Sequence, residues 1–176
     1  MDQYNHQIFK TKKLNIGVIY RNYKDTNRGK NLIKIANACK KSRYQLFVSN
    51  DIKLALKVKA NGIYIPSFNT TRKFSNLEKK NFAIIGSAHN QSEIKTKISQ
   101  NCSAIFLSPI FKVEKSKTFL GLHKFNYLQQ INNIKILALG GVSEKNIRKL
   151  KLLSIKGFGG ISIFKKKPAF IQGRFL

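Results

Sequence analysis

Short apolar runs recur along the chain, and longer segments of mixed character separate them. The runs span four or five residues each and are rich in Ile, Val and Phe: residues 16–20, 45–49, 62–65, 82–86, 104–108, 135–139 and 160–164. Short, continuous runs with β-branched residues are typical of strands that are buried on both faces. The pattern therefore predicts seven such strands.

The intervening segments carry apolar residues at helical spacing. The sets are Leu32, Ile35, Ala36 and Cys39; Leu54, Ala55 and Val58; Ile94 and Ile98; Phe125, Leu128 and Ile131; and Ile147, Leu150 and Leu153. Strands that alternate with helices predict a parallel sheet with crossover helices. Seven strands are one fewer than a (β/α)8 TIM barrel needs, so an open flavodoxin-like sheet is the alternative. The length favours a single domain over residues 1–176.

The stretch "ILALGGVSEKNIRKL", residues 136–150, breaks an apolar run at two glycines. Ser143 then reads as the N-cap of a helix. In barrels the loops after strands 7 and 8 frequently bind phosphate, because glycine exposes backbone N–H groups. The sequence thus predicts a phosphate cup, and a plain tight turn is the alternative. The cup would comprise Gly140, Gly141, Gly159, Gly160 and Ser162.

Composition changes this picture little. There are 34 Lys and Arg residues against 7 Asp and Glu residues, a net charge of +27 that favours anionic ligands. The basic residues are spread along the chain and form no aromatic-interleaved run, which argues against a nucleic-acid partner. Cys39 and Cys102 fit no zinc or disulfide pattern and are expected to be buried thiols. With no long apolar span or signal-like start, a cytoplasmic protein without a membrane partner is expected.

Several segments in one order carry a resemblance that covers residues 16–165. They are "NDIKLALKVKANGIYIP", "IIGSAHNQSEI", "FLSPIFKVEKSKTFLGL" and "ILALGGVSEKNI". Together they resemble the thiamine phosphate synthase and TenI family. The resemblance implies a (β/α)8 barrel that binds phosphorylated thiazole and pyrimidine precursors of thiamine. Synthase members join hydroxymethylpyrimidine diphosphate to thiazole phosphate and release pyrophosphate, and TenI members tautomerise the thiazole phosphate.

On the first visible strand, the family's Gln-x-Arg-x-Lys segment corresponds to "IYRNYK". Arg21 matches the arginine and is expected to clamp a phosphate. Ile19 replaces the glutamine, and Lys24 lies one place late. Isoleucine forms no hydrogen bond, so part of the pyrimidine contact is lost.

The family's Asn-Asp pair, which serves Mg²⁺ and diphosphate, is present as Asn50 and Asp51. Asp51 is equally expected as a helix N-cap. Where the family has a second aspartate, this chain offers Asn69 or Ser67. A lone carboxylate with neutral oxygens makes a poorer site, so these residues support the implied Mg²⁺ weakly.

Two further family elements follow later strands. Ser87 and His89 match a Ser-x-His element, and a histidine there can move a proton near neutral pH. The diphosphate loop corresponds to residues that include Ser116, Lys117 and Thr118. Gly140, Gly141, Gly160 and Ser162 match the cup for the thiazole phosphate.

Three functions follow from the resemblance. A synthase, a transferase, would place Arg21, Ser116 and Lys117 around the leaving diphosphate. A tautomerase would move a proton with His89 and need no metal. A degenerate member would bind a phosphorylated ligand without turnover. The first strand-helix unit of the barrel is expected to be missing or abbreviated, with residues 5–9 as a short strand. An unclosed sheet exposes unpaired backbone, which favours a homo-oligomer.

Overall fold

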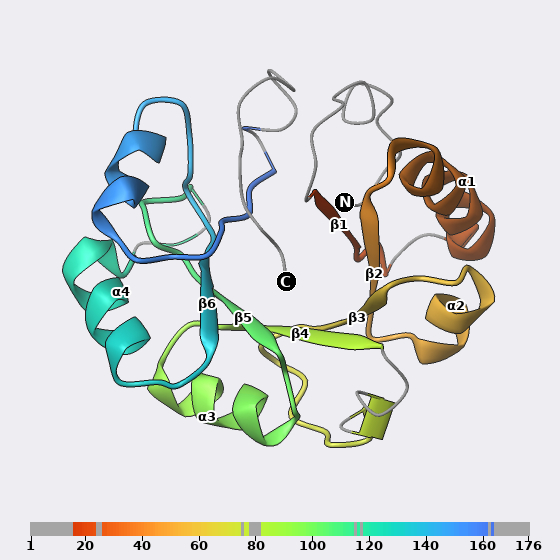
Figure 1. Cartoon of the computed structure of the whole chain (residues 1–176), viewed down its shortest axis with the longest axis horizontal. Coiled ribbons are helices and arrows are strands. Elements are labelled where there is room, and N and C mark those ends of the chain that lie inside the picture. Colours follow the sequence, from red (N-terminus) through yellow and green to blue (C-terminus); the bar gives the residue numbers. More distant parts are fainter. Residues whose placement is uncertain are drawn as a thin grey trace.

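A six-stranded parallel sheet organises the protein. The computed structural model describes residues 16–23, 26–74, 76–77, 82–114, 116, 118–161 and 163. The strands follow one another across the sheet in sequence order (Figure 1). Their bounds are β1 Gly17–Tyr20, β2 Gln45–Ser49, β3 Gly62–Ile65, β4 Ala83–Ala88, β5 Ala104–Leu107 and β6 Lys135–Ala138. Six of the seven predicted strands are therefore confirmed within one or two residues.

The order of the strands decides between the two expected architectures. A flavodoxin-like sheet reverses its strand order at a switch point, with the first strand in its interior. Here β1 lies at one edge and each later strand is added on the same side. The sheet curves into an arc with the helices on its convex face, as in part of a barrel (Figure 1). The open flavodoxin-like alternative is wrong.

Helices cover the convex face, and side-chain caps begin two of them, α2 and α3. Their bounds are α1 Arg28–Ser42, α2 Ile52–Lys57, α3 Gln91–Ser99 and α4 Gly121–Gln130, and the 3-10 helix η3 spans Ile147–Leu152. Asp51 caps α2 by accepting the Leu54 N–H at 3.0 Å, and Asn90 caps α3 by accepting the Glu93 N–H at 2.9 Å. These caps satisfy N–H groups that a helix start leaves unpaired.

The segment after β6 differs from its prediction. Ser143 is no helix N-cap, because η3 begins four residues later and Asn146 precedes it. The Ser143 N–H instead donates to Asn146 Oδ1 at 2.8 Å, and Asn146 Nδ2 donates to Gly141 O at 2.8 Å. Asn146 thus closes a turn, and the apolar spacing is realised as a 3-10 helix.

The predicted strand at residues 160–164 is also wrong. A single parallel bridge pairs Phe158 with Ala138, while Ile161 lies in a bend and Ile163 is helical. Ala138 donates to Gly157 O at 3.2 Å and accepts from Gly159 at 2.8 Å. A Cβ at Gly159 would lie 2.9 Å from the Phe106 ring. The bridge therefore falls on the glycine-rich segment, where the backbone can approach, rather than on the apolar run after it.

The sheet separates two layers of buried side chains. Ile63, Ile84 and Ile105 pack with helix residues such as Leu32 and Phe125 in the outer layer. A smaller cluster faces the concave side, as alternation along each strand requires. It consists of Phe47, Tyr64, Ile85, Ala104, Phe106 and Leu137. Side chains in phase with this inner cluster are the ones that reach the concave face.

The two thiols are buried, as predicted. Burial raises the pKa of Cys39 and of Cys102 to about 12. Both are free cysteines. Among the helices in the described part of the chain, none combines the length and the apolar character needed to cross a membrane.

Candidate functional site

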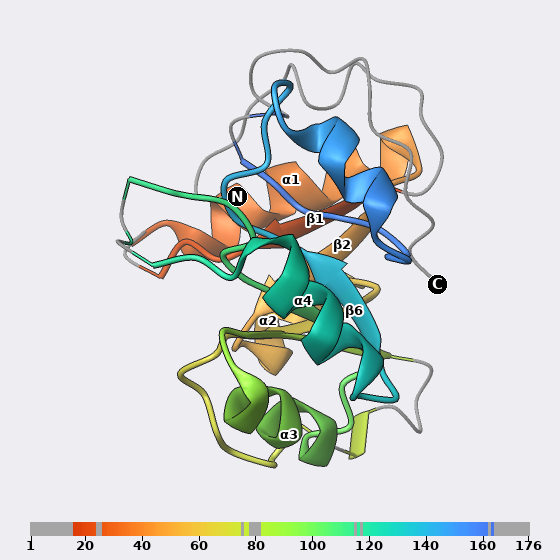
Figure 2. The same cartoon turned by 90° about the vertical axis from the view of Figure 1, so that its left-hand side faces the viewer.

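The carboxyl ends of the strands carry polar side chains on the concave face. Because the strands are parallel, their carboxyl ends meet at one edge of the sheet, where ligands bind in such folds. The loops after β1 and β5 project from this same end (Figure 2). Arg21, Ser49 and Ser87 lie in phase with the inner cluster at the ends of β1, β2 and β4. They form the rim of the candidate site.

Tyr64 joins two of these strand ends. Its buried side chain forms hydrogen bonds with the side chains of Ser87 and Arg21. Burial raises the pKa of Tyr64, whereas these two hydrogen bonds act in the opposite direction. The hydroxyl thus holds the Arg21 guanidinium beside Ser87. The sequence argument missed Tyr64, although its phase within the third apolar run assigns it to the same face as Phe47.

A second network lies around the start of α1. Arg28 pairs with Asp51 at 3.3 Å between Nη1 and Oδ2, and its Nη2 donates to Ser49 O at 2.8 Å. Tyr23 forms a hydrogen bond with the Ser49 hydroxyl. The same Asp51 also caps α2, which was its alternative role. The sequence argument gave Arg28, Tyr23 and Ser49 no functional role, although Tyr23 lies within "IYRNYK".

The side chains of Asn50 and Asn69 meet at the ends of β2 and β3. Asn69 Nδ2 donates to Asn50 Oδ1 at 2.8 Å. Asn50 adopts φ +57°, a left-handed conformation that asparagine tolerates, and its N–H donates to Tyr64 O at 3.1 Å. The end of β2 is thereby joined to the loop after β3.

A buried lysine fixes the loop that carries Asn69. Lys97 Nζ donates to Pro66 O, Asn69 O and Gln100 Oε1 at 2.9, 2.7 and 3.0 Å. Gln100 Nε2 donates to Asn69 O and Thr71 O at 2.9 and 2.7 Å. Burial lowers the pKa of Lys97. Two side chains from α3 therefore hold the loop at the rim.

His89 follows β4 at the start of α3. Its ring Nδ1 lies 2.9 Å from Glu93 Oε2, and its backbone N–H donates to the same oxygen at 2.9 Å. The side chain is 49% exposed, so it lies at the surface of this end. A carboxylate that orients an imidazole is compatible with proton transfer. The catalytic role of His89 stays a prediction.

The glycine pair after β6 is a steric requirement. Gly140 and Gly141 adopt φ +87° and +73°, which disfavours any residue with a Cβ. A Cβ at Gly140 would lie 2.7 Å from Pro109 Cβ, and one at Gly141 would lie 2.6 Å from Phe111 O. The pair therefore packs directly under the loop after β5.

At this turn the backbone carbonyl groups of the two glycines accept hydrogen bonds, whereas their N–H groups form none with the described residues. Gly140 O accepts the Phe111 N–H at 3.1 Å, and Gly141 O accepts from Asn146. Among the described residues, neither glycine's N–H donates to an acceptor. Gly160 lies two residues beyond the bridge to β6, as Gly140 does on its own strand. Ser162 lies outside the described residues.

The loop between β5 and α4 holds part of the predicted diphosphate clamp. It begins with a cis peptide bond between Ser108 and Pro109. The Ser116 hydroxyl donates to Thr118 O at 2.8 Å, so it stabilises the loop itself. Lys117 lies outside the described residues. The phosphate-binding role of Ser116 stays a prediction.

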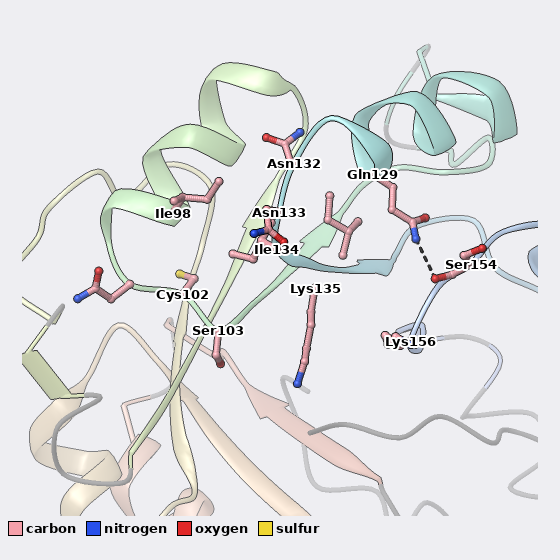
Figure 3. Close-up of a pocket in the computed structure, with 12 residues that line it drawn as sticks. Ile98, Cys102, Ser103, Gln129, Asn132, Asn133, Ile134, Lys135, Ser154 and Lys156 are labelled. Atoms are coloured by element: carbon pink, nitrogen blue, oxygen red, sulfur yellow. Dashed lines mark hydrogen bonds between the residues drawn. The ribbon is translucent and has the colours of Figure 1, made fainter.

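A cleft of about 660 Å³ lies at the opposite end of the strands (Figure 3). Ser103 and Lys135, which precede β5 and lie at the start of β6, border it together with Asn132 at the end of α4 (Figure 3). The side chain of Gln129 donates to Ser154 O at 2.9 Å across one wall. Of the predicted site residues that the structure describes, none lines this cleft.

Comparison with known families identifies the chain. A family model described as thiamine monophosphate synthase matches residues 12–164. The chain belongs to this family. The thiamine-phosphate synthase of Prochlorococcus marinus strain MED4 is 33% identical over 134 residues, which are 72% of this chain and 37% of that protein. The chain thus spans only about a third of the length of the Prochlorococcus proteins that it matches.

Other members of the thiamine monophosphate synthase family match over a larger share of both chains. The thiamine-phosphate synthase of Clostridium perfringens strain 13 is 28% identical over 168 residues, 90% of this chain and 81% of its own. Among solved structures, the thiamine phosphate pyrophosphorylase of Pyrococcus furiosus gives a TM-score of 0.71 at 15% identity and covers 88% of this chain and 75% of its own. At that identity the structural match establishes the fold alone. The family assignment from the motifs is confirmed.

Proposed function

We propose that this protein is a thiamine-phosphate synthase. It would join hydroxymethylpyrimidine diphosphate to thiazole phosphate, forming a carbon–nitrogen bond as the carbon–oxygen bond to diphosphate breaks. The products would be thiamine phosphate and pyrophosphate. Membership of the family over residues 12–164 supports this reaction. We further propose that the six-stranded sheet is the described part of a (β/α)8 barrel formed by one domain.

The placement of Arg21 is the observation that carries the proposal. Tyr64 holds its guanidinium at the strand ends beside Ser87. Negative charge develops on diphosphate as it leaves, so a fixed cation there lowers the barrier. Ser116 and Lys117 of the β5–α4 loop would contact the same diphosphate from the other side. Catalysis would then be electrostatic and would need no protein nucleophile.

The glycine turn would receive the second substrate. The N–H groups of Gly140 and Gly141 donate to no acceptor among the described residues, which leaves them available to a phosphate ester. Gly160 and Ser162 would complete this cup. Asn50 would contact the pyrimidine half from the opposite side of the mouth. The Mg²⁺ that the family implies would be expected at Asp51.

A coupled assay with both substrates tests the proposal. Wild-type protein is expected to form thiamine phosphate, and Arg21→Ala is expected to lower kcat/KM by about 100-fold, because it removes a preorganised charge. His89→Ala is expected to retain most turnover. Arg148→Ala, at an exposed position of η3, is the matched control and should be silent.

Other patterns would contradict a synthase. Thiazole tautomerisation that is abolished by His89→Ala and retained in Arg21→Ala would identify a tautomerase. Titration of thiazole phosphate that shows binding, with no turnover of either kind, would identify a non-catalytic member.

A further inference from the structure

Arg28 places a guanidinium where the family's acidic pair is expected to meet a metal. It begins α1, and its Nη1 and Nη2 contact Asp51 Oδ2 at 3.3 Å and Ser49 O at 2.8 Å. Its side chain is 19% exposed. The cation is therefore largely withdrawn from water and fixed by two directed contacts.

The carboxylate and amide oxygens that could hold Mg²⁺ at this position are already engaged by N–H groups. Asp51 Oδ1 accepts from Leu54, and Asp51 Oδ2 accepts from Arg28. Asn50 Oδ1 accepts from Asn69, whose own Oδ1 accepts the Thr71 N–H at 2.9 Å. Mg²⁺ demands oxygen ligands in near-octahedral order, with carboxylates preferred.

The positive charge of Arg28 also disfavours Mg²⁺ at this position. The Arg28 guanidinium neutralises Asp51 and would repel a divalent ion at this distance. Within the described residues, no three His, Cys, Asp or Glu side chains cluster in a way that could hold a metal ion. The residues present do not fit a resident Mg²⁺.

The surroundings of Arg28 suit a permanent cation. Its guanidinium carbon lies 5.8 Å from the Tyr20 ring centroid and 5.5 Å from that of Tyr23. Aromatic faces attract a cation within about 6 Å. The buried Nε has no hydrogen-bond partner among the described residues. Arginine also stays charged at any accessible pH.

We propose that Arg28 is the built-in cation of this site and that the chain binds a diphosphate anion without a metal ion. Its guanidinium and that of Arg21 would flank the diphosphate from neighbouring positions near the β1 end of the sheet. Planar guanidinium groups suit phosphate oxygens, to which they donate pairs of hydrogen bonds. This inference rests on the proposed function, since it names how that site holds the leaving group.

Calorimetric titration of inorganic pyrophosphate tests it. Wild-type protein is expected to bind pyrophosphate in EDTA, and Arg28→Met is expected to weaken that binding about tenfold, as for loss of a charged hydrogen bond. Arg148→Met serves as the control and should bind as the wild type does. Arg28→Lys retains the charge without the planar guanidinium, and its affinity for pyrophosphate is expected to lie between those of the wild type and Arg28→Met. The circular dichroism spectrum of Arg28→Lys checks that the fold is kept. Titration of Mn²⁺ followed by electron paramagnetic resonance should show no tight site in the wild type.

The outcomes separate this inference from the proposed function. Pyrophosphate binding that requires Mg²⁺, a tight Mn²⁺ site, or equal binding by Arg28→Met would each overturn the inference. Coupling that proceeds only with Mg²⁺ would do so as well and would leave the synthase intact. Pyrophosphate binding in EDTA without any coupling of the two substrates would support the inference and contradict the synthase.

Discussion

The rim of the candidate site is built differently at the two ends of the strand series. Near β1 to β4, side chains form the rim, with Arg21, Tyr64 and Ser87 hydrogen-bonded across three strands. After β6, the rim is backbone, and Gly140 and Gly141 pack against the loop after β5. The side-chain half has diverged from the family pattern, with isoleucine at position 19. The backbone half retains it, because close approach admits no side chain.

The largest expected effect comes from breaking the backbone half. Gly141→Ala would place a Cβ 2.6 Å from Phe111 O at φ +73°, so the β5–α4 loop must move. Gly121→Ala is the matched control, since Gly121 has φ +70° but nothing within 4 Å of an added Cβ. A left-handed residue costs about 1–2 kcal/mol, the full loss expected for Gly121→Ala. Urea unfolding should show a larger loss for Gly141→Ala, and titration should show that its affinity for thiazole phosphate is lost. Equal losses for the two variants would mean that packing under the loop is unimportant.

Sequence reasoning captured this half of the site better than the other. The glycine pair after the apolar run forms a backbone corner that admits no side chain, whereas its phosphate-binding role stays a prediction. The polar network near β1 depends on which side chains share a face across strands that lie far apart in sequence. The motifs assign no role to Tyr64 or Arg28, and only the sheet register and the start of α1 bring them to the rim.

A smaller effect is expected from breaking the side-chain half. Tyr64→Phe removes the hydroxyl shared by Arg21 and Ser87. Loss of a hydrogen bond to a charged group is worth about 1.5–3 kcal/mol, so turnover should fall by at least tenfold. Tyr127→Phe, at a position 60% exposed, should leave turnover unchanged. If Tyr64→Phe turns over normally, Arg21 does not depend on the tyrosine for its position.

The fold was predictable where apolar pattern and burial agree, and α3 shows where they do not. The spacing of Ile94 and Ile98 predicts that both face the sheet. Ile98 is instead 41% exposed, and Lys97 is fully buried. Three acceptors around the Lys97 ammonium and its contact with the Asn69 loop outweigh the usual preference of lysine for water. Residue types alone give no sign of such a partner set.

The smallest expected effect is a difference in how stability depends on pH, and it tests the role of Lys97. Because burial lowers the pKa of Lys97, the unfolded chain binds more protons between the folded pKa and the unfolded value of about 10.4. The stability of the wild type should therefore rise with pH in that window relative to Lys97→Met. Urea unfolding at a series of alkaline pH values measures the difference, and Lys95→Met on the exposed side of α3 is the control. Parallel pH profiles for wild type and Lys97→Met would show that the Lys97 pKa is not lowered.

Two thiols are buried behind the sheet at different places. Cys39 belongs to α1, and Cys102 lies just before β5, beside Gly86 and Lys97. With a pKa of about 12, neither sulfur is a nucleophile until its surroundings come apart. Modification of each thiol therefore reports the opening of its surroundings. The order in which a thiol reagent modifies Cys39 and Cys102 shows whether the region of α1 or the region before β5 opens first.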